Sequence, residues 1–312
     1  MTSLRETVLR ARRNKIKNRS VSDIFLDIFI YLVFSLFSFI CVYPFYYIFI
    51  NTISDNKLSE KGAINWLPQG LHLTNYIDAF KIPGLVQATY ISVSRTVIGT
   101  VLTVLCAAFM GYMFTRETVW KRKFWYRFVV ITMYFNAGII PWYLTMMNLG
   151  LTNNFWGYIL PTVVSPFYII LTKTYLESTP KELQEAAECD GARVLTIFFK
   201  IMLPIAKPIL ATIAIFSAVT QWNAFQDTLL LMTQEKFYTL QFVLYRYLQS
   251  SQSLKAIINA TSGSAQAMMS NAQTQTSIRM TVTILVALPI LLVYPMFQKF
   301  FVKGIMIGAV KG

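Results

Sequence analysis

The chain has 312 residues, of which 55% are hydrophobic and only 13% charged, and its formal net charge is +14. A soluble domain of this length carries about 25% charged residues, so the composition excludes an ordinary soluble protein and predicts an all-α integral membrane protein. One histidine, His72, and three scattered cysteines offer little for histidine catalysis, a metal site or a disulfide, so we expect no catalytic and no metal-binding residue.

The chain begins with a polar segment, residues 1–23, that holds seven basic residues. An apolar run from Ile24 to Ile50 follows. It is too long for the apolar core of a signal peptide and lacks a small-residue cleavage site. We therefore predict a retained first transmembrane helix, kinked at Pro44, and then a segment outside the membrane over residues 51–88.

Five further apolar runs predict five more helices, at about 89–114, 124–146, 155–176, 205–232 and 279–301. Arg95 lies near the outer end of the second helix, where its side chain can reach the membrane interface. Pro141 should interrupt the third helix, beside Asn136 and Gly138. A polar segment, 233–277, separates the last two helices. Residues 24–301 thus form one six-helix transmembrane domain, followed by a tail over 302–312.

The basic residues indicate the orientation of these helices. The N-terminal segment, the loop after the second helix, the loop after the fourth helix and the C-terminal end together hold 20 of the 28 lysines and arginines. By the positive-inside rule, these segments and both termini are cytoplasmic. The topology accounts for the positive net charge, so we expect no nucleic-acid partner.

The cytoplasmic loop over Ser178–Pro208 has a pattern of its own. Thr179 suits a helix N-cap, and Glu182 three residues later completes a capping box, so a short polar helix should begin here. Gly191 then permits a sharp turn. A second, apolar helix follows and should bend or break at Pro204.

The same loop resembles the EAA loop of the membrane subunits of ABC importers. The matching residues are Glu185, Ala186, Ala187, Asp190, Gly191, Ala192, Ile201, Leu203 and Pro204. In that family the loop forms a coupling helix that docks in a groove on a separate ATPase subunit. The resemblance implies that Glu185, Ala186, Ala187, Asp190 and Gly191 couple this chain to such an ATPase. An amphipathic helix without a partner is the alternative, and Asp190 could instead cap the next helix.

Three further stretches narrow the resemblance: Tyr134–Pro161, residues 95–100 and residues 301–312. They are similar to the MalG-type, LplC/YtcP-like branch of carbohydrate importer permeases. This implies a type I ABC importer permease fold in a bacterial cytoplasmic membrane. It also implies a heterodimer with a second permease, an ATPase dimer, an extracellular sugar-binding protein (a lipoprotein in Gram-positive bacteria) and an oligosaccharide cargo.

The chain carries no G-x-x-x-x-G-K-[ST] motif, so the ATPase site must lie on another polypeptide. We expect that this chain is not an enzyme and binds no cofactor itself. ATP and magnesium would belong to the partner ATPase.

A sugar path through the membrane needs aromatic surfaces and polar groups within the helices. Six residues of the third and fifth helices meet this need: Tyr134, Asn136, Trp142, Trp222, Asn223 and Gln226. Hydrogen bonds between helices, aromatic packing or an interfacial tryptophan belt are the alternatives. Asp227 should lie near the outer surface, touching the binding protein or capping a turn.

Two other functions remain open on this evidence. The EAA loop is shared across importers, so the cargo could be an amino acid, a phosphate or a metal, although the flanking sugar-branch stretches argue against this. A six-helix channel or intramembrane enzyme would need a repeated pore segment or paired carboxylates. Asp227 is the only candidate carboxylate and has no visible mate in the sequence.

Overall fold

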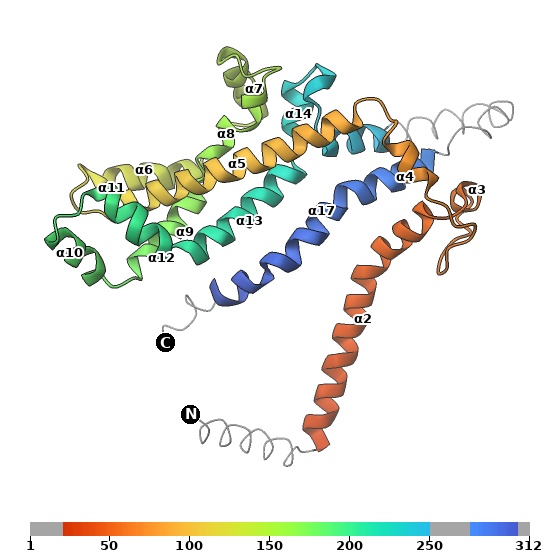
Figure 1. The fold of residues 1–312 in the computed structure, drawn as a ribbon, viewed down its shortest axis with the longest axis horizontal. Coiled ribbons are helices and arrows are strands. Elements are labelled where there is room, and N and C mark those ends of the chain that lie inside the picture. The colour runs from red at the N-terminus through yellow and green to blue at the C-terminus, as the bar shows by residue number, and fades with distance from the viewer. Residues whose placement is uncertain (1–20, 250–274, 305–312) are drawn as a thin grey trace. The chain divides into compact units, whose positions relative to one another are not determined.

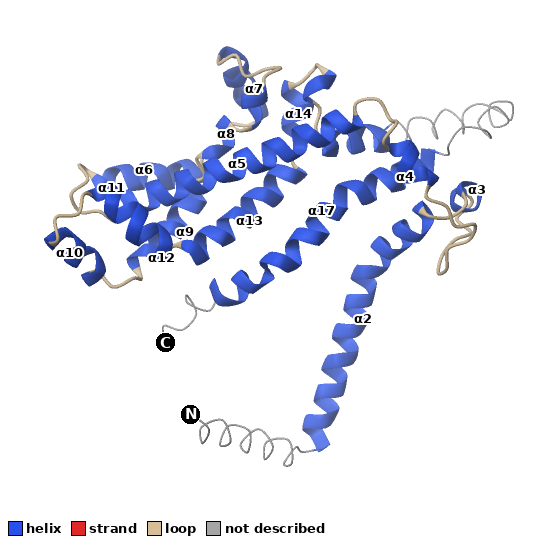
Figure 2. Ribbon diagram, in the orientation of Figure 1, coloured by secondary structure: helices blue, strands red, loops and turns tan. Residues whose placement is uncertain are grey.

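The structure is a computed structural model, and it describes residues 21–249 and 275–304 (Figure 1). All regular elements within these ranges are helices (Figure 2). Most of the predicted N-terminal segment 1–23, most of the tail 302–312 and residues 250–274 of the segment 233–277 lie outside the described residues. The chain divides into two compact units, residues 1–72 and 73–312, and each is described by itself.

The first unit consists of the long helix α2 (Val21–Thr52), the short helix α3 (Asn56–Glu60) and the loop after it. Helix α2 continues through Pro44, and nearly all of its apolar side chains are exposed, as suits a helix surrounded by lipid. Its C-terminal end is fixed by Asn51, which is fully buried. The Asn51 amide donates to Tyr47 O and Ile64 O and accepts from the Ser59 hydroxyl, so the loop folds back onto the helix end.

The second unit is built around α5 (Leu85–Met113), the longest helix described in it apart from α17 (Gln275–Gly304). Helices α13 (Lys207–Asn223) and α9 (Pro166–Glu177) pack along α5, and α17 packs on α13 (Figure 1). Close approach of α9 depends on Gly111, because a Cβ there would lie only 2.7 Å from Thr172 Cβ. Short helix α4 (Thr74–Ala79) contacts α17.

Three of the predicted spans are bent pairs of shorter helices. Helices α6 (Arg122–Tyr134) and α7 (Ile139–Asn148) meet at 119°. The segment with η1 (Phe155–Tyr158) and α8 (Leu160–Val163) meets α9 at 44°. The segment with α11 (Val194–Ile197), the π-helical η2 (Phe198–Met202) and α12 (Leu203–Ile205) meets α13 at 77°. Counting each pair as one span, together with α2, α5 and α17, gives the six predicted within the described residues.

One helix interruption lies a few residues before the predicted proline, and another was not predicted. The third span breaks at residues 135–138, before Pro141, because the Asn136 carboxamide oxygen accepts from Gly138 N (2.9 Å) and Gly138 has φ 88°. Pro141 then lies in the first turn of α7, where its missing N–H is harmless. The predicted fifth helix 205–232 ends at Asn223, since Ala224 is extended, and resumes as α14 (Gln226–Leu231).

Candidate functional site

The short polar helix α10 spans Glu182–Cys189 and lies at one end of the second unit (Figure 1). The predicted capping box is wrong. The Thr179 hydroxyl donates back to Leu176 O instead of accepting from the new helix, and the residue before the helix, Lys181, provides no side-chain cap. The helix therefore begins two residues later than the capping pattern predicts.

The turn after α10 has the geometry that the sequence predicts for Gly191. Its φ is 76°, in the left-handed region, and its N–H donates to Glu188 O at 3.0 Å. Asp190 closes the helix through its backbone N–H, which donates to Ala186 O. Its carboxylate is exposed and does not cap α11, whose start has no side-chain cap.

The predicted coupling residues divide between two faces of α10. Glu185 and Ala186 are exposed, as is Asp190 at the corner. Ala187 instead packs against the buried core cluster that includes Tyr112 and Phe198. The helix thus presents small and acidic side chains outward while one alanine anchors it inward.

A second anchor was not predicted from the sequence. Arg116, just after α5, forms an ion pair with Glu188 of α10, which also accepts from Gln184 Nε2 at 3.1 Å. The Arg116 side chain is 7% exposed and that of Glu188 is 42% exposed. The hydrogen bond from Arg116 lowers the pKa of the Glu188 carboxyl. We call this pair the clasp.

The clasp forms one wall of a polar hollow of about 440 Å³ between the loop after α5 and α10. Glu185 and Lys181 also line it, and Lys181 Nζ lies 4.0 Å from Glu117 Oε1. Helix α10 and the loop that follows α5 therefore carry charges of opposite sign that face each other. The signal that could have indicated this is the basic loop itself, which lies next to an acidic helix on the same predicted side of the membrane.

A second hollow lies where the third and fifth spans break. It has a volume of about 490 Å³, and we call it the inter-break hollow. Helices α7 and α14, which bound it, contact each other. Its lining residues are Asn136, Gly138, Ile139, Trp142, Asn223, Ala224, Phe225, Gln226, Asp227 and Leu230.

Four of the six predicted substrate-path residues come together in this hollow, although they are separated by up to 90 positions: Asn136, Trp142, Asn223 and Gln226. The side chains of Asn223 and Gln226 are exposed, and neither amide forms a hydrogen bond within the described part of the chain. Tyr134 is 79% exposed and does not line the hollow.

Trp222 lies apart from the inter-break hollow, and its assignment to the substrate path stays a prediction. It is 8% exposed, and its indole N–H donates to Val286 O of α17 at 2.9 Å. It packs in a core cluster with Leu85 and Val282. The alternative that the sequence left open, hydrogen bonding between helices, describes its environment.

Arg95 and Asp227 form the main charged contact beside the inter-break hollow. Arg95 Nη2 lies 2.5 Å from Asp227 Oδ2, and Nη1 lies 3.1 Å from Oδ1. Arg95 also donates to Gln221 Oε1 from Nε and Nη2, at 3.2 and 3.0 Å, and its Cζ stands 4.4 Å from the Tyr158 ring centroid. The Arg95 side chain is therefore buried in an ion pair and does not extend outward, contrary to the prediction. Asp227 has a charged partner.

The sequence contained a signal for this pair. Arg95 is the single charged residue of α5, Asp227 is the single acidic residue of the predicted fifth span, and a charge inside a membrane helix normally faces a partner. Their positions in the sequence do not indicate that they pair with each other, because they are 132 residues apart.

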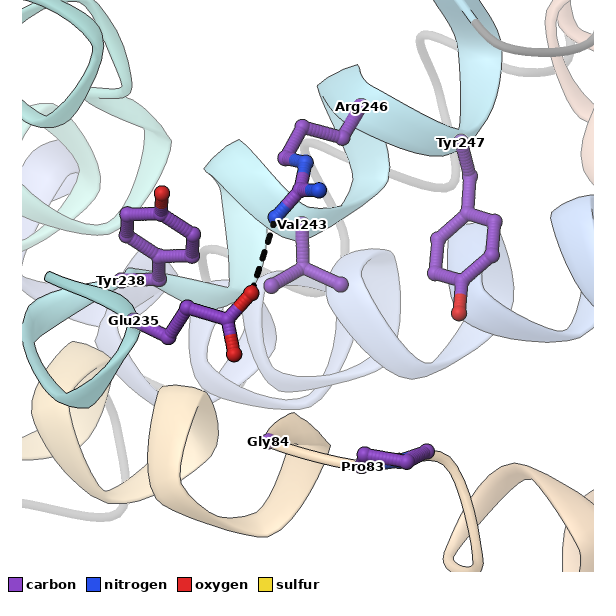
Figure 3. A pocket seen from close by; sticks show the side chains of 7 residues that line it. All are labelled: Pro83, Gly84, Glu235, Tyr238, Val243, Arg246 and Tyr247. Atoms are coloured by element: carbon purple, nitrogen blue, oxygen red, sulfur yellow. Dashed lines mark ion pairs between the residues drawn. The ribbon is translucent and has the colours of Figure 1, made fainter. Parts of the chain in front are cut away.

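A third pocket, of about 300 Å³, lies between the start of α5 and the residues after α14, and we call it the Arg246 pocket (Figure 3). Arg246, in the helical residues 240–249, points toward Glu235 of η3 (Glu235–Phe237), with Nη1 and Oε1 3.7 Å apart. Tyr238 and Tyr247 flank this pair. The described part of the predicted outside segment 233–277 is therefore folded against α5 and presents charged and aromatic groups.

The described residues hold no group of three or more His, Cys, Asp or Glu side chains that could bind a metal. The chemistry available at the two hollows is hydrogen bonding, ion pairing and stacking on aromatic rings.

Comparison with known proteins gives three findings. Residues 11–306 match the family of binding-protein-dependent transport system inner membrane components. The chain is 33% identical to the polygalacturonan/rhamnogalacturonan transport system permease protein YtcP of Bacillus subtilis, over 92% of this chain and 98% of YtcP, and 33% identical to protein LplC of the same organism, over 88% and 90%. It is also similar, with a TM-score of 0.80 and 28% identity, to a chain in the crystal structure of a bacterial ABC transporter involved in the import of the acidic polysaccharide alginate; the match covers 91% of this chain and 99% of that one.

Proposed function

Since the chain belongs to the family of binding-protein-dependent transport system inner membrane components, we propose that it is one of two different permease subunits of an ATP-driven oligosaccharide importer. The family assignment makes it a multi-pass inner-membrane ABC importer permease and not a catalytic subunit. The oligosaccharide cargo, the heteromeric assembly and the alternating-access mechanism are the proposed parts. The observation that carries the proposal is α10, which is held to the protein on one side and free on the other.

Helix α10 suits docking on an ATPase subunit. Its exposed Ala186 has no bulk to keep the helix out of a groove, and Glu185 beside it supplies a charge for the partner. Gly191 fixes the corner, so a push on α10 is transmitted to α11 and onward to α13. ATP and magnesium would be bound by the partner, and this chain would bind no cofactor.

The inter-break hollow supports a saccharide cargo. Free amides at Asn223 and Gln226 can exchange hydrogen bonds with hydroxyl groups, and Trp142 offers a ring on which a sugar can stack. Polar groups at interrupted helices are the usual construction of a transporter site. A solute without hydroxyl groups would leave these amides unsatisfied, which favours a sugar over the non-sugar alternative.

A second permease would complete this path. The surface of α6 and α7 beside the hollow is apolar and exposed, including Tyr134, Phe135, Ile139 and Ile140. We assign this surface to the second permease. We assign the predicted outside segments, with the Arg246 pocket, to the extracellular binding protein. The distribution of basic residues supports cytoplasmic termini.

The direct test is purification of the tagged chain from its host in mild detergent, with mass spectrometry of the proteins that accompany it. We expect a second permease and an ATPase. The accompanying binding protein is then screened against a glycan panel and against amino acids, phosphate and metal ions. Isolation of the chain alone, while a control ABC complex survives the same detergent, would contradict the assembly; a binding protein that takes only a non-sugar solute would contradict the cargo.

A further inference from the structure

We propose that Asp227, held in place by Arg95, determines specificity in the inter-break hollow by selecting neutral saccharides over acidic ones. This inference rests on the proposed oligosaccharide path. The pair is asymmetric: the side chain of Arg95 is 1% exposed, whereas that of Asp227 is 15% exposed and lines the hollow. The anion therefore faces the hollow and the cation is sealed behind it.

Asp227 keeps one acceptor position for a ligand. A carboxylate offers about four lone-pair positions for hydrogen bonds. Oδ1 accepts from Arg95 Nη1 and from Thr228 N (2.9 Å), and Oδ2 accepts from Arg95 Nη2. The remaining position belongs to Oδ2, and a sugar hydroxyl is a suitable donor to it. A hydrogen bond to a charged acceptor is stronger than one to a neutral amide.

Arg95 cannot turn into the hollow to meet an acidic ligand. Gln221 Oε1 accepts from two of its nitrogens, and Gln221 is itself fixed because its Nε2 donates to the Thr162 hydroxyl at 2.8 Å. The Tyr158 ring covers the guanidinium on another side. Gly99 leaves the space that Gln221 occupies, since a Cβ there would lie 2.8 Å from Gln221 Nε2. Arg95 is therefore a positioning residue.

Among the described residues, the lining of the hollow offers no cation for a carboxylate ligand. Its ten lining residues include one acid, Asp227, and no lysine, arginine or histidine. The carboxylate of a uronic acid would approach Asp227 without a counter-ion from the described part of the chain, and like charges brought together at an interface are strongly disfavoured. A neutral sugar presents only hydroxyl groups and meets acceptors and amides that suit them.

The test uses the complete transporter with its binding protein in proteoliposomes and two matched probes. Galactotriose and trigalacturonate differ in the oxidation of C6, which is a hydroxymethyl group in one and a carboxylate in the other. Because the same binding protein serves every variant, a changed ratio between the two uptake rates reports on the permease. The variants are Arg95→Met, Asp227→Asn and the double variant. The control is Lys81→Met with Asp78→Asn, a pair at the end of α4 whose lysine side chain is 70% exposed.

The yield of assembled complex tests the pairing without any cargo. Each single variant strands a buried charge, so we expect low yields, whereas the double variant removes both charges and should recover the yield. For the double variant we expect the half-saturating concentration of galactotriose to rise about tenfold, because one charge-assisted hydrogen bond is lost. We also expect its preference for galactotriose over trigalacturonate to fall, while the control pair changes neither quantity.

Several outcomes would overturn the inference. Normal yields of both single variants would show that the pair is not buried in the membrane, and an unchanged half-saturating concentration and ratio in the double variant would leave Asp227 a structural role only. If the wild type imports neither probe, the cargo found by the binding-protein screen decides between the remaining cases. An acidic saccharide as cargo overturns this inference alone, and a neutral saccharide replaces galactotriose in the assay. A non-sugar solute overturns the proposed function as well.

Discussion

Two arginines, one toward each end of α5, form the same type of contact in different surroundings. Arg95 lies in the third turn of the helix and Arg116 lies three residues beyond its last residue, about 30 Å further along the axis. Arg95 is sealed between Asp227, Gln221 and Tyr158. Arg116 is buried too, but its acid, Glu188, is partly open to solvent. Because solvent and salt weaken exposed ion pairs much more than buried ones, the contrast indicates a fixed contact at one end and a releasable contact at the other.

The position of each contact agrees with this contrast. The fixed pair holds the break between α13 and α14, where a binding surface needs constant geometry. The releasable pair holds α10, the element that we expect to move with an ATPase. The following predictions test the contrast from its largest consequence to its smallest.

The largest effect is expected at the outward face of α10. Glu185→Lys reverses the charge presented to the ATPase and should abolish uptake while the chain still inserts in the membrane, as measured by transport and by membrane fractionation. Glu60→Lys, an equivalent reversal on the exposed end of α3, is the control and should transport normally. Normal uptake by Glu185→Lys would remove the basis for treating α10 as a docking element.

The clasp should have an intermediate effect. Arg116→Met frees the inner side of α10, so we expect the maximal uptake rate to fall about three- to tenfold, because a partly exposed ion pair contributes only modestly to the position of the helix. The half-saturating concentration of the saccharide should not change, since the hollow is distant. A change confined to the half-saturating concentration would mean that the two ends of α5 are not independent.

The clasp should also respond to pH. The pKa of Glu188 in the folded protein is lower than the ordinary 4.5, so its contribution is fully present above pH 4.5 and is lost as the pH falls through the lower folded value. Spin labels at Thr118 and Cys189 should keep one separation between pH 7 and 5 and move apart in stronger acid. In Arg116→Met the separation should be wide throughout; equal behaviour of the two proteins would show that the clasp does not hold α10.

The smallest effects come from two neighbours on α13. Asn223→Ala removes one amide from the hollow and should raise the half-saturating concentration about fivefold without loss of thermal stability, since a neutral hydrogen bond contributes ~1 kcal/mol. Trp222→Phe removes the hydrogen bond to Val286 O and should lower stability by ~1 kcal/mol without changing that concentration. Thr220→Ala, one turn earlier on the exposed side, is the control. If Trp222→Phe raised the half-saturating concentration and left stability unchanged, Trp222 would belong to the substrate path.

Much of the fold could be predicted because its determinants are local. Six apolar runs, the turn at Gly191, an interruption near Pro141 and a bend near Pro204 follow from hydropathy and from glycine and proline chemistry. The break after Asn223 and the exact residues at which helices end or begin could not be predicted, because they depend on side-chain contacts. Asn136 ends α6 before Pro141 is reached, and Thr179 uses its hydroxyl on the preceding helix instead of capping the next.

The residue types of the candidate site could be predicted, but the direction in which each side chain points could not. Trp222 and Asn223 are adjacent in sequence and equally suitable for a sugar, yet a helix turns about 100° per residue, so one faces α17 and the other faces the hollow. Which face meets which neighbour depends on the packing of α5, α13 and α17. Arg95 and Asp227 illustrate the same limit, because only the three-dimensional arrangement brings them together.

The sequence distance between Arg95 and Asp227 has a consequence for biosynthesis. Asp227 follows 132 residues later, and at ~5–20 residues per second a ribosome needs roughly 7–26 s to supply it. During that interval Arg95 lacks Asp227, and an unpaired charge within the bilayer is costly, so we expect its guanidinium to stay at the lipid headgroups or within the insertion machinery. We therefore expect α5 to reach its final depth when α13 and α14 arrive, and newly made chains truncated before α14 to be the ones that quality-control proteases remove.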